Sequence, residues 1–144
     1  MIVMKFGGSS VQTAENARGV VGVVKKAKTT NATLLVVVSA LEHVTRLLVS
    51  ISEFIENGNK KEVRGRINSL VNLHRYLLSS LGMPCARAEK ALQEFRNLLL
   101  LESCGDYPRL RDTVLAAGEL ASSQMYREIF TWFGVDTEWV DPRQ

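Results

Sequence analysis

The order of apolar and polar positions predicts strands and a helix that alternate along the first forty residues. Residues 2–6 are a short apolar run, rich in strand-forming types, that ends at two glycines and two serines. From residue 14 apolar side chains recur at helical spacing, after Thr13 in the N-cap position. Residues 33–38 are a continuous apolar run with three valines. A strand without polar alternation is typical of a parallel sheet buried on both faces, so this pattern predicts a βαβ unit.

The predicted βαβ unit also indicates where a ligand would bind. Parallel strands end at the same edge of a sheet, so residues 7–10 and 39–43 are expected to lie together at its carboxyl edge. In open α/β sheets, ligands bind outside that edge.

Helical periodicity dominates the rest of the chain. Four apolar stripes predict helices, at residues 44–55, 67–81, 88–99 and 114–129. The second and third are expected to form an antiparallel pair laid on the sheet and joined by a turn at residues 82–85. Residues 137–140 predict a third strand, which Asp141 and Pro142 end. No repeat or linker divides the chain, so residues 1–144 are treated as one unit.

Composition excludes several classes of protein. With 46% hydrophobic and 23% charged residues, the 144-residue chain can bury a core and is not intrinsically disordered. Two cysteines argue against a disulfide scaffold and for a reducing compartment, so we expect a cytoplasmic protein. No apolar run approaches the roughly 20 residues of a membrane span. The net charge of +3 is small and scattered, which gives no support to a nucleic-acid partner.

The first candidate site is the segment Lys5-Phe6-Gly7-Gly8-Ser9-Ser10. A lysine, two glycines that leave the backbone accessible and two hydroxyls suit the oxygens of a phosphate group. The lysine precedes the glycines, so the segment matches neither G-x-x-x-x-G-K-[ST] nor G-x-G-x-x-G. A tight turn beside a solvated lysine is the alternative interpretation.

Two further segments carry candidate polar groups. Ser39 leaves the second strand at the expected ligand edge, and Thr45 falls in the first turn of the next helix, where hydroxyls also serve as ordinary caps. Gly118 lies inside the last helix, where glycine costs about 1 kcal/mol relative to alanine, so it indicates the close approach of another element. Glu119 beside it is either a surface acid or a partner for an ammonium group.

These segments together resemble the N-terminal half of the aspartate kinases. The resemblance rests on Lys5 to Val11, on Val37 to Ala40 with Val44-Thr45, on Gly118-Glu119, and on Val140 to Arg143, in the same order and spacing. It implies an α/β fold, a three-layer αβα sandwich with a mainly parallel sheet, of which this chain holds a truncated part. It also implies transfer of the ATP γ-phosphoryl group to the side-chain carboxylate of L-aspartate, the first step of lysine, threonine and methionine synthesis.

The same resemblance implies roles for individual residues. Lys5 would contact the phosphates of ATP, and Gly7, Gly8 and Ser9 would line the phosphate loop. The residues that would hold aspartate are Ser39, Ala40, Thr45 and Glu119, the last through the α-ammonium group. ATP with Mg²⁺ is the implied nucleotide, without a metal site made by these residues, and the full-length enzyme would be a homo-oligomer.

The chain also departs from the family pattern. His43 stands where the family commonly has a small residue, Arg46 where it has asparagine, and Ala116 and Ala117 where a hydroxyl is usual. The Gly-rich, Ser-Asp segment that completes the nucleotide site, and the regulatory domains, do not occur in these residues. We therefore expect an N-terminal part of a kinase domain that is inactive alone. The alternatives are a non-catalytic binding or assembly module with this fold, and another member of the amino-acid kinase superfamily.

Overall fold

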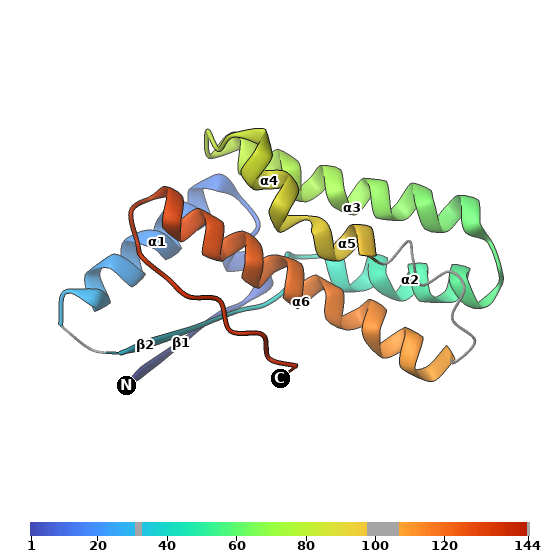
Figure 1. Ribbon diagram of the computed structural model, residues 1–144, viewed down its shortest axis with the longest axis horizontal. Coiled ribbons are helices and arrows are strands. Elements are labelled where there is room, and N and C mark those ends of the chain that lie inside the picture. The colour runs from blue at the N-terminus through green and yellow to red at the C-terminus, as the bar shows by residue number, and fades with distance from the viewer. Residues whose placement is uncertain (31–32, 98–106, 144) are drawn as a thin grey trace.

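The computed structural model describes residues 1–30, 33–97 and 107–143. Two strands and a series of helices follow one another along the chain (Figure 1). In order they are β1 (Ile2–Phe6), the short 3₁₀ helix η1 (Gly8–Ser10), α1 (Ala14–Lys28), β2 (Leu34–Val38), α2 (Val44–Glu56), α3 (Lys60–Ser80), α4 (Cys85–Ala91), α5 (Gln93–Asn97) and α6 (Tyr107–Trp132). Within these ranges no helix is long and apolar enough to cross a membrane.

The two strands form a parallel sheet, which confirms the predicted βαβ unit. Ile2 pairs with Leu34 and Phe6 with Val38, so the strands are in register along their whole length. The backbone N–H of Ser39 donates to Phe6 O at 3.0 Å and extends the ladder one residue beyond β2. The loops after β1 and β2 therefore leave the sheet side by side at its carboxyl edge.

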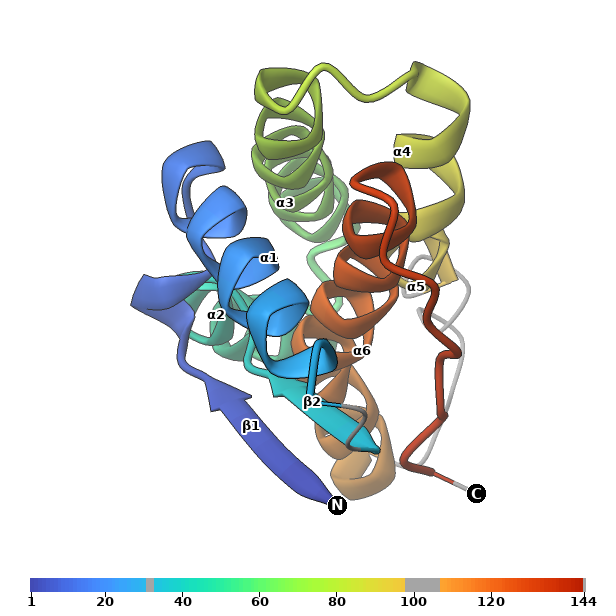
Figure 2. The same cartoon turned by 90° about the vertical axis from the view of Figure 1, so that its left-hand side faces the viewer.

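The helices lie on one side of this sheet. Figure 2 shows α1 directly above the strands and α6 beside it, with α3 and α4 further out. Alternate strand residues, such as Met4, Phe6 and Val36, pack against the buried cluster beneath α1, α2 and α6. The outer layer, defined here as α3, α4 and α5, packs on α2 and α6. The antiparallel pair predicted to lie on the sheet thus lies one layer away from it.

The opposite face of the sheet is exposed in the described residues, which corrects the expectation of two buried faces. Val3 is 57% exposed, Leu35 43% and Val37 42%. The valine-rich pattern predicts a strand correctly, but burial also requires an element that covers the second face, which strand periodicity does not supply. The α/β class with a parallel sheet is confirmed, and these residues build the sheet together with the helices of one face.

Two further predictions need correction. Residues 137–140 pair with no strand in the described ranges. Instead the indole Nε1 of Trp139 donates to Ser123 Oγ at 2.9 Å and ties the tail to α6. The helix predicted over residues 88–99 is divided into α4 and α5 at Leu92, and its last two residues lie outside the described part of the chain.

Candidate functional site

The loop after β1 is held in shape by side chains from two helices. The N–H of Ser10 donates to Gly7 O at 2.9 Å, which closes the turn. The side-chain amide of Asn16 in α1 donates to Ser9 O. The hydroxyl of Tyr126 in α6 donates to Val11 O at 3.0 Å, and burial raises the pKa of this phenol, so it remains a donor. The loop is therefore fixed while its outer residues, Ser9 and Ser10, are exposed.

The loop after β2 turns inward before α2 begins. Ala40 and Leu41 are buried, with 4% and 2% of their surface exposed. His43, the N-cap of α2, has φ 68°, in the left-handed region where glycine is favoured. A small residue is what the resemblance leads one to expect at this position. Thr45 is exposed in the first turn of α2.

The three predicted motifs meet at Ala40. A Cβ placed on Gly8 would lie 2.8 Å from Ala40 O, closer than any real contact of that kind. A Cβ placed on Gly118 would lie 3.0 Å from Ala40 Cβ and 2.9 Å from Leu48 Cδ1. The close approach predicted from a glycine inside the last helix is therefore confirmed. We call residues 5–9, 39–45 and 118–119 the carboxyl-edge corner.

The charged and hydroxyl side chains of the corner are accessible. Lys5 and Glu119 are exposed, and in the part of the chain that the structure describes neither takes part in an ion pair. Met4 and Phe6 face the core, so alternation places Lys5 on the uncovered face of the sheet. Ser39 continues β2 and falls on the same face as Lys5 by the same alternation. A cation, a hydroxyl and an acid thus lie on segments that meet at one residue.

Glycine at position 7 has a different environment from glycine at position 8. A Cβ on Gly7 would meet nothing within 4 Å, and its backbone is extended, with φ −76°. Neither packing nor conformation therefore requires glycine at Gly7. The space beside Gly7 is open, as a phosphate loop requires for close approach of a ligand to the backbone.

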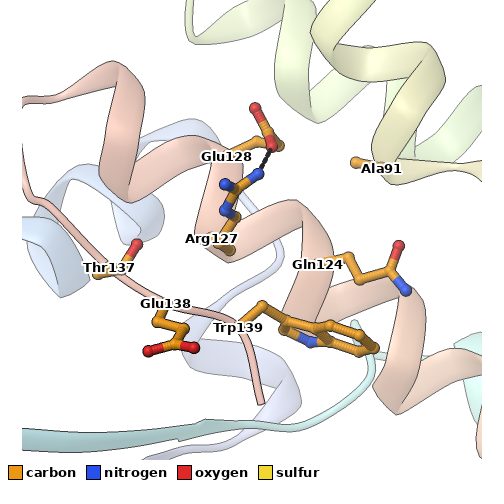
Figure 3. A pocket seen from close by; sticks show the side chains of 7 residues that line it. All are labelled: Ala91, Gln124, Arg127, Glu128, Thr137, Glu138 and Trp139. Atoms are coloured by element: carbon orange, nitrogen blue, oxygen red, sulfur yellow. Dashed lines mark hydrogen bonds and ion pairs between the residues drawn. The ribbon is translucent and has the colours of Figure 1, made fainter. Parts of the chain in front are cut away.

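A pocket of about 520 Å³ lies elsewhere, between α6 and the C-terminal tail (Figure 3). We call it the outer pocket; its lining residues are Ala91, Gln124, Arg127, Glu128, Thr137, Glu138 and Trp139. Glu128 is 6% exposed and accepts from Arg87 at 3.2 Å and from Arg127. Arg127 and Glu128 thus satisfy one another on this wall, whereas the buried hydroxyl of Thr137 has no hydrogen-bond partner among the described residues. No residue proposed from the sequence lines this pocket.

Sequence reasoning missed two residues that shape the corner, Asn16 and Tyr126. Asn16 lies three residues after Thr13, the N-cap of α1, and the backbone N–H of Asn16 donates to the Thr13 hydroxyl at 3.1 Å. The pattern of a capped helix therefore predicts this backbone hydrogen bond, but it does not predict the bond that the Asn16 side chain makes to the loop. Tyr126 is a phenol beside the apolar stripe of α6 and is 1% exposed. A buried hydroxyl needs a partner, which is the one sequence signal that such a residue offers.

The described side chains do not form a cluster of metal ligands. Across residues 1–30, 33–97 and 107–143 no three or more His, Cys, Asp or Glu side chains gather in a way that could hold a metal ion. The donor groups of the corner are the Lys5 ammonium, hydroxyls, the His43 imidazole and the carboxylates of Glu42 and Glu119. In the described part of the chain these side chains do not gather into a set that could hold a divalent cation.

Comparison with known proteins relates the chain to a family, to a curated relative and to a solved structure. The model of the family described as "Amino acid kinase family" matches residues 1–144. Lysine-sensitive aspartokinase 3 of Escherichia coli (strain K12) is 28% identical over 147 residues, which cover 100% of this chain and 31% of the relative. The crystal structure of E. coli aspartokinase III in complex with aspartate and ADP (R-state) superposes with a TM-score of 0.67 at 28% identity and covers 91% of this chain and 29% of that one. The chain thus spans less than a third of the relatives' length.

Proposed function

The chain belongs to the amino acid kinase family, and from this premise we propose that residues 1–144 are the N-terminal portion of an aspartate kinase domain. The full-length enzyme would transfer the γ-phosphoryl group of ATP to the side-chain carboxylate of L-aspartate. The solved relative holds aspartate and ADP, which supports both ligand classes. The chain covers 31% of the curated relative, so we expect these 144 residues alone to give no turnover.

The observation that carries the proposal is the meeting of three motifs at Ala40. The lysine-glycine segment, the segment from Ser39 to Thr45 and the Gly118-Glu119 pair are far apart in sequence. All three lie close together, since a Cβ added to Gly8 or to Gly118 would lie within 3.0 Å of an Ala40 atom. Phosphoryl transfer depends on positioning two ligands and on neutralising charge, and a corner made from three segments provides both.

The chemistry assigned to the corner needs no acid or base from the protein. An aspartate side chain has a pKa near 4, so at neutral pH its carboxylate is already an anionic nucleophile. One carboxylate oxygen would form a bond to the γ-phosphorus as the bond from that phosphorus to the β-phosphate oxygen breaks. The products are an acyl phosphate and ADP. Each electron pair is accounted for without a proton transfer.

Individual residues of the corner would act on different parts of the two substrates. The ammonium of Lys5 would neutralise negative charge on the transferring phosphoryl group, where opposite charge lowers the barrier. The backbone of Gly7, Gly8 and Ser9 would surround the phosphates, with open space for a ligand beside Gly7. Ser39, Ala40 and Thr45 would hold aspartate through hydroxyl and backbone groups, and Glu119 would pair with its α-ammonium group.

The remaining parts of the proposal concern the setting of the enzyme. The nucleotide substrate would be ATP with Mg²⁺ on its phosphates, in line with the ADP held by the solved relative. We propose a cytoplasmic enzyme of amino-acid biosynthesis that self-associates when full length, without a nucleic-acid or membrane partner.

A coupled assay of ADP formation tests the proposal. The full-length enzyme should release ADP only when both ATP and L-aspartate are present, while glutamate, acetylglutamate and carbamate should be poor replacements for aspartate. Preference for another small acid would favour a different member of the superfamily. Binding of aspartate and ATP without turnover in the full-length protein would favour the non-catalytic module. Absence of both binding and turnover would reject the proposal.

A further inference from the structure

Gly118 and Gly8 contact the same residue, Ala40, from two different segments of the chain. We infer that Gly118 is a positioning residue. Together with Gly8 it fixes residues 39–43, which we call the Ala40 loop, between the proposed phosphate and aspartate subsites. The inference rests on the proposed function for its kinetic consequences and on geometry alone for its structural ones. Gly118 has no side chain with which to bind a substrate, so its role would be to position other residues.

The environment of Gly118 differs from that of the other helical glycines. A Cβ on Gly118 would lie 2.9 Å from Leu48 Cδ1, 3.0 Å from Ala40 Cβ and 3.2 Å from Val44 Cγ1. A Cβ on Gly22 in α1, or on Gly65 in α3, would meet nothing within 4 Å. Alanine is favoured over glycine inside helices, so replacing Gly22 or Gly65 should be harmless or stabilising. At Gly118 the same replacement meets three neighbours.

The three neighbours of Gly118 can yield to different extents. The Leu48 methyl group is the end of a flexible side chain and can rotate away. Ala40 has no rotamer to change, so its Cβ moves only with its backbone, and Val44 is a β-branched residue in the first turn of α2. A methyl group at position 118 would therefore displace the loop and the start of α2, which carry Ser39 and Thr45.

Gly8 limits the same loop through backbone atoms. Its Cβ position is 2.8 Å from Ala40 O and 3.2 Å from Glu42 N, neither of which can rotate away. Movement of Ala40 is thus constrained by the phosphate loop as well as by α6. The two proposed subsites share one rigid residue, so a displacement in one is transmitted to the other by direct contact.

The kinetic test compares Gly118→Ala with the control Gly22→Ala in the full-length enzyme. A shift of the loop by a fraction of an ångström to 1 Å should raise KM for aspartate or lower kcat/KM by roughly 10- to 100-fold. The control Gly22→Ala should have the same KM for aspartate and the same kcat/KM as the wild-type enzyme. The double variant Gly118→Ala with Ala40→Gly removes the methyl group that Gly118→Ala would strike and should recover most of the loss, with Ala40→Gly alone measured to complete the cycle.

A merely structural role predicts different kinetics. Fewer folded molecules would lower the apparent kcat in proportion to the folded fraction and leave KM for aspartate unchanged. An unchanged KM with unchanged kcat/KM per folded molecule in Gly118→Ala, or no recovery in the double variant, would overturn the inference. The fraction folded is measured by circular dichroism on the same samples.

A second measurement separates this inference from the proposed reaction. In ¹⁵N-labelled 144-residue chain, Gly118→Ala should shift the amide resonances of residues 39–45 and of Gly8, and Ala40→Gly should reverse those shifts. Gly22→Ala should shift amides within α1 alone. Shifts confined to residues 114–122 would overturn the positioning role even if the enzyme phosphorylates aspartate. If wild-type enzyme fails to do so, the proposed function fails while the amide shifts still decide the contact.

Discussion

The carboxyl-edge corner and the outer layer are held together by different kinds of contact. At the corner, backbone and small side chains from three distant segments approach closely at Ala40, and the charged groups face solvent. In the outer layer, long side chains satisfy one another: Glu89 accepts from Arg75 at 2.7 Å and also pairs with Arg96. His74 packs there edge-on against Phe95, with ring centroids 4.6 Å apart.

The proposed site therefore differs from the outer layer, whose side chains pair with and pack against one another. The outer pocket has a volume of about 520 Å³, and Glu128 in its wall pairs with Arg87 and Arg127. At the corner, Lys5 and Glu119 are exposed, and within the described residues neither takes part in an ion pair. Changes to the exposed side chains of Lys5 and Glu119 should therefore alter substrate binding and turnover with little effect on stability, whereas changes in the outer layer should do the reverse.

The largest effect is expected at Lys5. Lys5→Ala should lower kcat of the full-length enzyme by about 10²- to 10³-fold, because a cation aimed at the transferring group is lost. Lys5 is exposed, so the unfolding free energy should stay within about 0.5 kcal/mol of wild type. The measurements are the coupled ADP assay and urea denaturation. The matched control is Lys25→Ala, an exposed lysine of α1, and near-normal turnover in Lys5→Ala would remove this residue from the site.

Glu119→Gln should have the next largest effect. Loss of a charge-assisted contact to the aspartate ammonium group should raise KM for aspartate by about 100-fold and change KM for ATP by no more than about twofold. Asp112→Asn is the control, because Asp112 is another exposed acid of α6. An equal rise in both KM values would contradict the assigned role.

His74 tests the outer layer through pH. Its ring is fully buried, Nδ1 lies 2.8 Å from Leu70 O, and burial lowers the pKa of the imidazole from 6.5 to about 4. The unfolded chain therefore binds a proton at a higher pH than the folded chain. The unfolding free energy should fall as the pH drops below 6.5, by about 2.5 kcal/mol between pH 7 and pH 4.5.

Urea titrations at several pH values measure this effect. His74→Leu should remove most of the fall between pH 6.5 and pH 4, whereas His43→Gln should retain it. A fall of the same size in His74→Leu would assign the pH dependence to other groups. Binding of aspartate at pH 7 should be the same in His74→Leu and in wild type, as expected of a group outside the corner.

The smallest effect is expected at His43. His43→Gly should raise the unfolding free energy by about 0.5 kcal/mol, because relief of the left-handed backbone exceeds the added entropy of the unfolded chain. His43→Asn should give a smaller gain, since asparagine tolerates this conformation and caps helices. Thermal denaturation measures both variants. A loss of stability in His43→Gly would mean that the histidine side chain contributes more than its backbone costs.

The sequence predicts which segments meet at the corner better than it predicts which faces of the sheet are buried. The runs at residues 2–6 and 33–38 and the stripe of α1 identify a βαβ unit, because periodicity is a local property. Gly118 indicates a close approach for the same reason, because glycine lowers the stability of a helix wherever the neighbours lie, and its presence there calls for a packing explanation. Both signals point to the carboxyl edge, where the structure brings Gly8, Ala40 and Gly118 together.

Tertiary partners explain where prediction fails. Residues 137–140 have strand-forming side chains, but a strand also needs a neighbour with which to pair, and here Trp139 bonds to α6 instead. The same reason applies to the exposed Leu35 and Val37, whose cover is not encoded in β2. Tyr126 escapes notice because its partner, Val11 O, lies 115 positions away in the chain.

Titration of the ¹⁵N-labelled full-length enzyme with L-aspartate tests the central claim most directly. Binding at the carboxyl-edge corner should shift the amide resonances of residues 39–45 and of Glu119, with a smaller response at Gly8 through its contact with Ala40. ADP added afterwards should shift residues 5–9. Shifts confined to Gln124, Glu138 and Trp139 around the outer pocket, or no saturable shift at the corner, would contradict the account.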